Sequence, residues 1–248
     1  MPRALVTGAT SGIGAEFARQ LAGRGYELVL VARDATRLRA RAAELDGAEV
    51  LPADLTTDVG CTKVCERLER PDVDVLVNNA GMGTYVAFGA GDLTLEEQQL
   101  DLNVRAVLRL THAAVRSMTG RGSGHIVNVS SVAGFVPRAS NATYSASKAW
   151  VTQFSEGLGL QLADTNVSVT AVCPGFVRTE FHQRAKADMS HVPDRMWLTP
   201  EAVVRGALAD VFAGRTLSVP TRRYQAMVLA SRLLPRPTLR ALMRRRGL

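Results

Sequence analysis

A glycine-rich stretch, Thr7-Gly8-Ala9-Thr10-Ser11-Gly12-Ile13-Gly14, lies between the apolar run 4–7 and a helical pattern that begins near Ile13. Its three glycines let the backbone turn tightly, approach a pyrophosphate and pack a helix against a strand, while the helix N-terminus faces the anion. A simple tight turn also uses glycine, but a position between strand and helix is typical of a dinucleotide site. The residues expected to contact the dinucleotide are Gly8, Thr10, Ser11, Gly12, Ile13 and Gly14.

Short apolar runs alternate with longer helical patterns along the rest of the chain. Repeated strand, helix, strand units imply right-handed parallel crossovers. The pattern predicts an α/β fold, a single doubly wound Rossmann-fold domain with a parallel sheet of about seven strands over residues 1–220. The strands are expected at residues 4–7, 27–32, 50–52, 73–78, 125–129, 167–172 and 216–219. Residues 221–248 are interpreted as a basic amphipathic C-terminal tail and not as a domain.

Composition agrees with a buried sheet in an intracellular protein. Hydrophobic residues make up 46% of the chain and aromatic residues only 5%, so Ala, Val, Leu and Ile must build the core. The three cysteines have no metal-site spacing, which favours a reduced, cytoplasmic chain without a metal centre. The first residues run directly into the glycine motif, and no apolar run reaches about 20 residues, so we expect neither a secretion signal nor a membrane span.

The positive charge is concentrated at the C-terminal end. Of the 30 basic residues, nine follow Asp210, where no acidic residue occurs, so the body carries a net charge of −2 although the whole chain carries +7. Beyond Pro220 the pattern predicts basic amphipathic helices. Such helices suit peripheral contact with an anionic membrane, or packing on the body or on a neighbouring subunit. Nucleic acid binding is not expected, because no stacking aromatic residues alternate with these arginines.

A candidate chemical site lies in the helix-favouring run 144–151. Tyr144 and Lys148 are four residues apart and therefore share one helical face. A positive charge beside a tyrosine stabilises its phenolate, so such a tyrosine can exchange a proton with a carbonyl oxygen as hydride reaches the carbon. A Tyr–Lys pair at this spacing is also common on helix surfaces. The neighbouring sequence favours a functional pair, because Ser130 and Ser131 directly follow strand 125–129. Parallel sheets bind ligands at the carboxyl ends of their strands.

Four further motifs are Asp54-Leu55, Asn78-Asn79-Ala80-Gly81, Asp101-Leu102-Asn103-Val104 and Cys173-Pro174-Gly175. With the glycine loop, the two serines and the Tyr144–Lys148 pair they make seven motifs in order over roughly residues 1–180, and they resemble those of the standard-length short-chain dehydrogenases/reductases. The resemblance implies an oxidoreductase that moves a hydride between a nicotinamide cofactor and a carbonyl or alcohol carbon, and a homo-oligomer, either dimer or tetramer. It assigns catalysis to Asn103, Ser131, Tyr144 and Lys148, with Tyr144 as general acid/base, Ser131 orienting substrate and Asn103 holding a water in the lysine's proton relay. Ser130 is expected to serve structure. Besides the glycine loop, the implied cofactor contacts are Asp54, Leu55, Asn79, Ala80, Gly81, Tyr144, Lys148, Pro174, Gly175, Val177 and Thr179.

The second strand ends in Ala32-Arg33-Asp34, which bears on the choice of cofactor. An acid about 20 residues beyond the glycines accepts from the ribose 2′-hydroxyl of NAD, and Asp34 meets that count. The resemblance instead places the discriminating position on Ala32, followed by Arg33 where NADP-type members meet the 2′-phosphate. A guanidinium binds a phosphate more strongly than it binds a hydroxyl group. We therefore predict NADP(H), with an NAD-dependent alcohol dehydrogenase as the alternative if Arg33 is only a solvated surface residue.

The substrate is less clearly indicated. Residues 180–199 correspond to the region that covers the substrate in this family, and Phe181, Met189 and Trp197 indicate an apolar, lipid-like small molecule with a carbonyl or alcohol group. His182 and His191 are interpreted as lid or surface residues, because neither has a nucleophile or metal partner. A non-catalytic dinucleotide-sensing scaffold is the other alternative, although the filled catalytic set argues against it. An epimerase would need a larger substrate domain.

Overall fold

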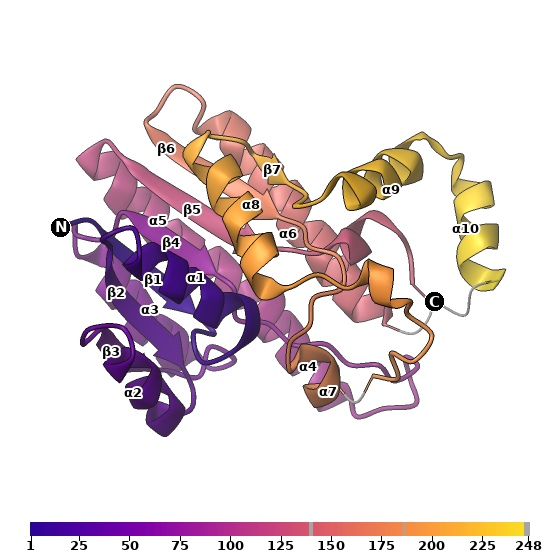
Figure 1. The fold of residues 1–248 in the computed structure, drawn as a ribbon, viewed down its shortest axis with the longest axis horizontal. Helices are drawn as coiled ribbons and strands as arrows, with labels where there is room; N and C mark the ends of the chain where they lie inside the picture. Colours follow the sequence, from indigo (N-terminus) through magenta and orange to yellow (C-terminus); the bar gives the residue numbers. More distant parts are fainter. Residues whose placement is uncertain (139–140, 186, 246–248) are drawn as a thin grey trace.

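A seven-stranded parallel sheet forms the centre of the molecule, with the strand order β3-β2-β1-β4-β5-β6-β7. The computed structural model describes residues 1–138, 141–185 and 187–245, so Arg246 of the basic tail lies outside the described residues. The predicted doubly wound α/β fold is confirmed (Figure 1). The strands are β1 (Arg3–Thr7), β2 (Glu27–Ala32), β3 (Glu49–Pro52), β4 (Val75–Asn78), β5 (Gly124–Val129), β6 (Val167–Val172) and β7 (Leu217–Ser218).

Two of the strands are shorter than predicted. β4 begins at Val75, and Val73 belongs to the preceding loop. Val73 is nevertheless buried in the core, so its apolar side chain led to a predicted strand that is two residues too long. β7 covers only Leu217 and Ser218 and pairs on one side alone, with β6. Burial and strand pairing are separate properties, and the apolar pattern reports only burial.

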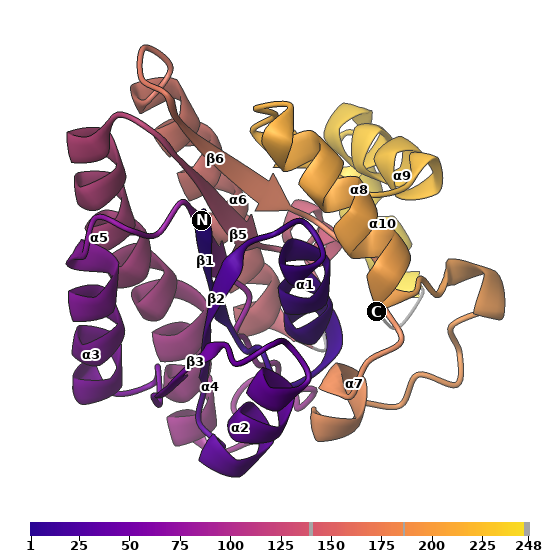
Figure 2. The ribbon, with the colours of Figure 1, turned by 60° about the vertical axis from the view of Figure 1, so that its left-hand side comes forward.

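Helices cover both faces of the sheet, as Figure 2 shows. Apolar side chains of α1, α2 and α8 pack on one face, and those of α3, α5 and α6 pack on the other. The core is therefore built of two layers of aliphatic side chains on either side of the strands. The helices are α1 (Gly12–Ala22), α2 (Ala35–Ala43), α3 (Asp58–Glu69), α4 (Leu93–Leu100), α5 (Ala106–Arg121), α6 (Ala142–Gln161), α7 (Phe181–Arg184), α8 (Pro200–Phe212), α9 (Arg222–Leu233) and α10 (Arg236–Arg245), with the short turns η1 (Asp101–Arg105), η2 (Val132–Phe135) and η3 (Asp194–Met196).

Strand order fixes where a ligand can bind. β1 lies between β2, which follows it in the chain, and β4, which comes later, so the chain switches direction across the sheet between β1 and β4. Ligands of open α/β sheets bind at such a switch point, beyond the carboxyl ends of the strands. The loops that follow β1, β4, β5 and β6 meet at this edge, and they contain the predicted motifs.

The C-terminal segment begins with a helix that packs on the body. Tyr224 of α9 is buried, and its hydroxyl donates to the Met196 carbonyl oxygen at 2.8 Å and accepts from the Phe176 N–H at 3.1 Å. Helix α10 lies at the periphery (Figure 1). None of the described helices combines the length and apolar character needed to cross a bilayer.

Candidate functional site

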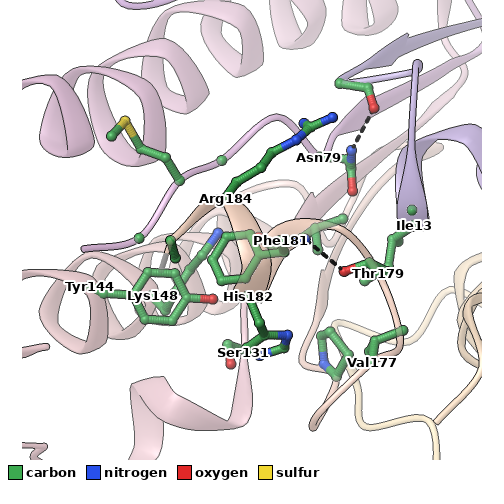
Figure 3. Close-up of a pocket in the computed structure, with 18 of the residues that line it drawn as sticks. Ile13, Asn79, Ser131, Tyr144, Lys148, Val177, Thr179, Phe181, His182 and Arg184 are labelled. Atoms are coloured by element: carbon green, nitrogen blue, oxygen red, sulfur yellow. Dashed lines mark hydrogen bonds between the residues drawn. The ribbon is translucent and has the colours of Figure 1, made fainter. Parts of the chain in front are cut away.

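A cavity of about 370 Å³ opens at the carboxyl edge of the sheet. The loops after β1, β4, β5 and β6 line it together with the start of the segment 180–198, called the lid segment below. Figure 3 shows Tyr144, Lys148 and Ser131 on one side of the cavity, with Ile13 and Thr179 on the other. Its volume is in the range of small-molecule and cofactor sites.

The glycine loop has the shape that a pyrophosphate requires. Gly8 and Gly12 have φ angles of +65° and +55°, in the left-handed region that side chains disfavour. A Cβ on Gly14 would lie 2.3 Å from the Gly8 carbonyl oxygen, so loop and helix pack in direct backbone contact. The Ser11 side chain makes no capping hydrogen bond to α1, which leaves the first N–H groups of the helix available to an anion. These features fit a dinucleotide phosphate.

The Thr7 and Asn79 side chains connect the ends of β1 and β4. The Thr7 hydroxyl oxygen accepts from the N–H groups of Asn79 and Ala80 at 2.9 and 3.0 Å, and the Asn79 amide donates to the Thr7 carbonyl oxygen at 2.9 Å. Next to them in the chain, Asn78 is buried, and its side-chain amide donates to the Thr111 hydroxyl and the Asn128 amide oxygen. This network holds the switch point rigid, because each of its buried polar groups has a partner.

Arg33 and Asp34 have different surroundings at the end of β2. Arg33 lines the cavity. The Asp34 carboxylate caps α2, since one of its oxygens accepts from the N–H groups of Thr36 and Arg37, each at 3.0 Å. An aspartate that caps a helix in this way would have to give up or share those bonds to bind a ribose hydroxyl.

Tyr144 and Lys148 are both buried on one face of α6, as their spacing predicts. The Lys148 ammonium donates to the Val129 carbonyl oxygen at 2.8 Å and lies 5.8 Å from the centre of the Tyr144 ring. Burial lowers the pKa of Lys148 to about 8. Burial also raises the pKa of Tyr144, and the opposing effects of the Ser131 hydroxyl and the Arg138 charge do not cancel the rise. Tyr144 is therefore protonated at neutral pH and has a proton to donate.

Asn103 lies in η1, a five-residue π-helical turn between α4 and α5. Its side chain is fully buried, accepts from the Met82 N–H at 3.0 Å and donates to the Met82 carbonyl oxygen at 2.8 Å. A Cβ placed on Gly81 would lie 3.1 Å from the Asn103 amide oxygen and 3.5 Å from the Lys148 ammonium, so both groups lie beside Gly81. π-Helical turns are frequent at functional sites because they re-aim a side chain.

The two serines at the end of β5 point differently. The Ser130 hydroxyl is buried and donates to the Lys148 carbonyl oxygen at 2.7 Å, which ties β5 to α6. Ser131 lines the cavity, and its hydroxyl oxygen accepts from the Ala133 N–H at 3.1 Å. Ser130 lines the cavity too, but its hydroxyl is already bonded to the Lys148 carbonyl oxygen and the Thr152 hydroxyl, so the Ser131 hydroxyl is the better placed of the two to bind a ligand.

Most of the predicted site residues meet at this one cavity, and four do not line it. Gly14 packs against the loop, and Asn103 is fully buried beside Gly81. The Leu55 side chain is buried in the core, and one Asp54 carboxylate oxygen accepts from the Thr56 N–H and hydroxyl at 3.0 and 2.8 Å. The predicted residues that line the cavity are Gly8, Thr10, Ser11, Gly12, Ile13, Arg33, Asn79, Ala80, Gly81, Ser131, Tyr144, Lys148, Pro174, Gly175, Val177 and Thr179.

The cavity also contains residues that sequence reasoning did not select. Tyr85 and Arg138 line it beside Tyr144, and no motif marks either of them. His182, interpreted as a lid or surface residue, is a lid residue whose ring lies against Trp197 and Phe181 at centroid distances of 5.2 and 5.4 Å. Because these residues come from separate loops, only the folded chain brings them together.

Backbone hydrogen bonds join the end of the lid segment to the residues just before its start. The Arg178 N–H donates to the Leu198 carbonyl oxygen at 2.9 Å, and the Leu198 N–H donates to the Phe176 carbonyl oxygen at 2.8 Å. At its start, Glu180 forms an ion pair with Arg37 of α2 at 3.1 Å. The lid segment therefore begins and ends beside the cavity.

Fold and site together define a dinucleotide-dependent oxidoreductase with a buried tyrosine–lysine pair. The family model described as short chain dehydrogenase matches residues 2–190, and the chain belongs to that family. It is thus an oxidoreductase of CH–OH and C=O groups.

Known proteins are similar to this chain over nearly its whole length. A putative ketoacyl reductase of Streptomyces coelicolor is 39% identical over 231 residues, which are 89% of this chain and 84% of the relative. A short-chain dehydrogenase from Sphingobium yanoikuyae, solved in complex with NADPH, superposes with a TM-score of 0.86 at 36% identity and covers 94% of each chain. The bulky-bulky ketone specific alcohol dehydrogenase from Comamonas testosteroni gives a TM-score of 0.81 at 33% identity, with 94% of this chain and 92% of that chain covered.

Proposed function

We propose that the protein is an NADP(H)-dependent carbonyl reductase, working in reverse as an alcohol dehydrogenase, with Tyr144 as its general acid/base. The observation that carries the proposal is the position of the buried Tyr144–Lys148 pair in the same cavity as the glycine loop. A bound nicotinamide cofactor supplies the hydride. The Ser131 and Tyr144 hydroxyls hold the carbonyl oxygen, and Tyr144 donates its proton to that oxygen as it gains charge.

Lys148 and Asn103 support the proton transfer from behind Tyr144. The ammonium group of Lys148 stabilises the phenolate that forms when the proton leaves. Asn103 and Lys148 both lie beside Gly81, which supports a relay that returns a proton to Tyr144 from this side. In the direction of alcohol oxidation the same tyrosine accepts the proton, so the ratio of oxidised to reduced cofactor decides the direction.

Preference for NADP(H) over NAD(H) is supported by the two side chains at the end of β2. Arg33 lines the cavity, whereas the Asp34 carboxylate already accepts two backbone N–H groups. The related structure from Sphingobium yanoikuyae was solved with NADPH. A guanidinium at this position would bind the 2′-phosphate through charge-assisted hydrogen bonds.

We expect the Arg33→Ala variant to weaken NADPH binding about 30-fold and to leave NADH binding within twofold, because hydrogen bonds to a charged group contribute roughly 2 kcal/mol. Titration of nicotinamide fluorescence gives both dissociation constants. Arg205→Ala, an exposed arginine on the outer face of α8, is the matched control and should change neither. NADH binding as tight as NADPH binding in the unaltered protein would favour the NAD-dependent alternative, and binding without turnover of any ketone would favour the scaffold.

The rate of ketone reduction should depend on the charge of Lys148. Because burial brings its pKa to about 8, the ammonium is present below that pH and is lost as the pH rises through it. We expect kcat/KM, which reports the free enzyme, to fall up to tenfold per pH unit above about pH 8. A profile measured from pH 6 to 10 that stays flat to pH 9.5 would show that Lys148 is not the titrating group.

The substrate is proposed to be a small ketone or alcohol with an apolar part. Phe176 and Phe181 line the cavity, and Phe181 lies 5.7 Å from Tyr144 between ring centroids. A cytoplasmic location and a homo-oligomer, dimer or tetramer, remain part of the proposal. The proposal also includes a peripheral membrane contact of the tail, supported by the exposed Leu229 and Leu233 on basic α9. Light scattering tests the homo-oligomer, and vesicle co-sedimentation at low salt tests the membrane contact.

A further inference from the structure

The substrate side of the cavity contains a guanidinium group that no motif and no proposed step uses. Arg138, in the loop between η2 and α6, lines the cavity beside Tyr144. Its guanidinium carbon lies 6.0 Å from the centre of the Phe176 ring, and its buried Nε atom has no hydrogen-bond partner among the residues that the structure describes. A buried donor without a partner costs free energy, and the cost is larger when the donor is charged.

Within the described residues, the lining of the cavity offers Arg138 no carboxylate. The charged and ionisable side chains that line it are Arg33, Tyr85, Arg138, Tyr144, Lys148, His182 and Arg184, and no aspartate or glutamate is among them. The His182 Nδ1 atom is also buried without a hydrogen-bond partner. This half of the cavity therefore has donors and positive charge that the chain itself does not satisfy.

The 2′-phosphate of the cofactor does not account for Arg138. Arg33, the residue proposed to meet the 2′-phosphate, follows β2, whereas the Arg138 loop follows β5. In the sheet, β2 and β5 are separated by β1 and β4, which is three strand spacings or about 14 Å. Arg138 thus lies on the side of the reacting carbonyl and not on the adenosine side.

Electrostatics agree with a position beside the reacting group. Burial raises the pKa of Tyr144, and the Arg138 charge is among the influences that oppose the rise. Burial also lowers the pKa of His182, and the Arg138 charge lowers it further. A charge that acts on both groups lies within reach of a substrate held at the Tyr144 hydroxyl.

An aromatic wall holds this charge in place. The Phe176 ring lies under the Arg138 guanidinium and packs on Trp197 at a centroid distance of 5.8 Å. Tyr224 supports the same loop, because its hydroxyl accepts from the Phe176 N–H. A guanidinium that lies over an aromatic ring makes no hydrogen bond to it, so its N–H groups remain available, and their fork geometry matches the two oxygens of a carboxylate.

We propose that Arg138 forms an anion subsite, so that the substrate is an oxo acid whose carboxylate binds Arg138 while its keto group meets Tyr144 and Ser131. The apolar part of the substrate would lie along the wall of Phe176 and Phe181. This assignment rests on the proposed reductase function, and it adds a charged recognition group to a substrate otherwise expected to be apolar.

The test compares two ketones that differ in one carboxylate, 4-oxo-4-phenylbutanoate and butyrophenone, with NADPH. We expect the unaltered protein to reduce the oxo acid with at least tenfold higher kcat/KM. The Arg138→Met variant should lose about 100-fold on the oxo acid and less than threefold on butyrophenone, because only the oxo acid loses a charge-assisted pair. Arg205→Met, at an exposed position on α8 outside the cavity, is the matched control and should preserve the preference.

Other outcomes separate the two proposals. If butyrophenone is reduced at least as well as the oxo acid, or if Arg138→Met slows both ketones equally, the anion subsite is wrong while the reductase function stands. If neither ketone nor a wider ketone panel is reduced although NADPH binds, the reductase function itself fails. Should Arg138→Met unfold below the assay temperature, Arg138→Lys serves instead, with about a tenfold loss on the oxo acid alone, since the charge stays but the paired geometry is lost.

Discussion

Replacing Tyr144 with phenylalanine is expected to lower kcat for ketone reduction about 1000-fold, because a positioned general acid typically contributes a factor of 10²–10⁴. Tyr144 is buried, and burial raises its pKa, so the unaltered hydroxyl carries its proton throughout the neutral range. The ring remains in the variant and still packs 5.7 Å from Phe181 between centroids. NADPH affinity, measured by fluorescence titration, should therefore change less than threefold.

Tyr26→Phe is a suitable control for the loss of a hydroxyl group alone. Tyr26 stacks on Phe212 at 6.3 Å and lies outside the cavity. Its variant should retain full activity. If Tyr144→Phe kept more than a tenth of the activity, another donor in the cavity would have to deliver the proton, and His182 would be the first to replace.

Adding one methyl group at Gly14 should weaken NADPH binding about 100-fold. Its Cβ would lie 2.3 Å from the Gly8 carbonyl oxygen and equally close to the Asn79 amide, and neither a backbone oxygen nor an anchored side chain can move cheaply. The loop must shift as a unit, and a phosphate site built from backbone N–H groups loses its shape when the loop moves. Isothermal titration of Gly14→Ala with NADPH measures the effect.

Gly157→Ala in α6 is the matched control, because a Cβ there meets nothing within 4 Å. It should bind NADPH normally and gain roughly 0.5–1 kcal/mol of stability, since alanine is the better helix former. Circular dichroism and thermal unfolding show whether Gly14→Ala still folds. A folded Gly14→Ala protein with unchanged NADPH affinity would mean that the backbone contact between loop and helix does not shape the phosphate site.

The C-terminal segment supports the site more directly than its composition suggests. A Cβ on Gly175 would lie 1.9 Å from the Tyr224 ring, so the loop after β6 lies directly on the buried ring of α9. The same tyrosine also binds the Met196 carbonyl oxygen near the end of the lid segment. The arginine-rich pattern of α9 indicates an exposed surface, and its single buried tyrosine is not visible in that pattern.

The α/β fold, the glycine loop and the Tyr144–Lys148 pair were predictable from the sequence, because each depends on spacing along one strand or helix. The folded chain was needed to show that Arg138 and His182 share the cavity, and that Asp34 caps a helix beside Arg33. It also decided the acid–base state of the site, since the raised pKa of Tyr144 and the lowered pKa of Lys148 both result from burial. Loops that are far apart in the chain bury Tyr144 and Lys148, and the spacing of residues within one helix or strand does not predict which loops will meet.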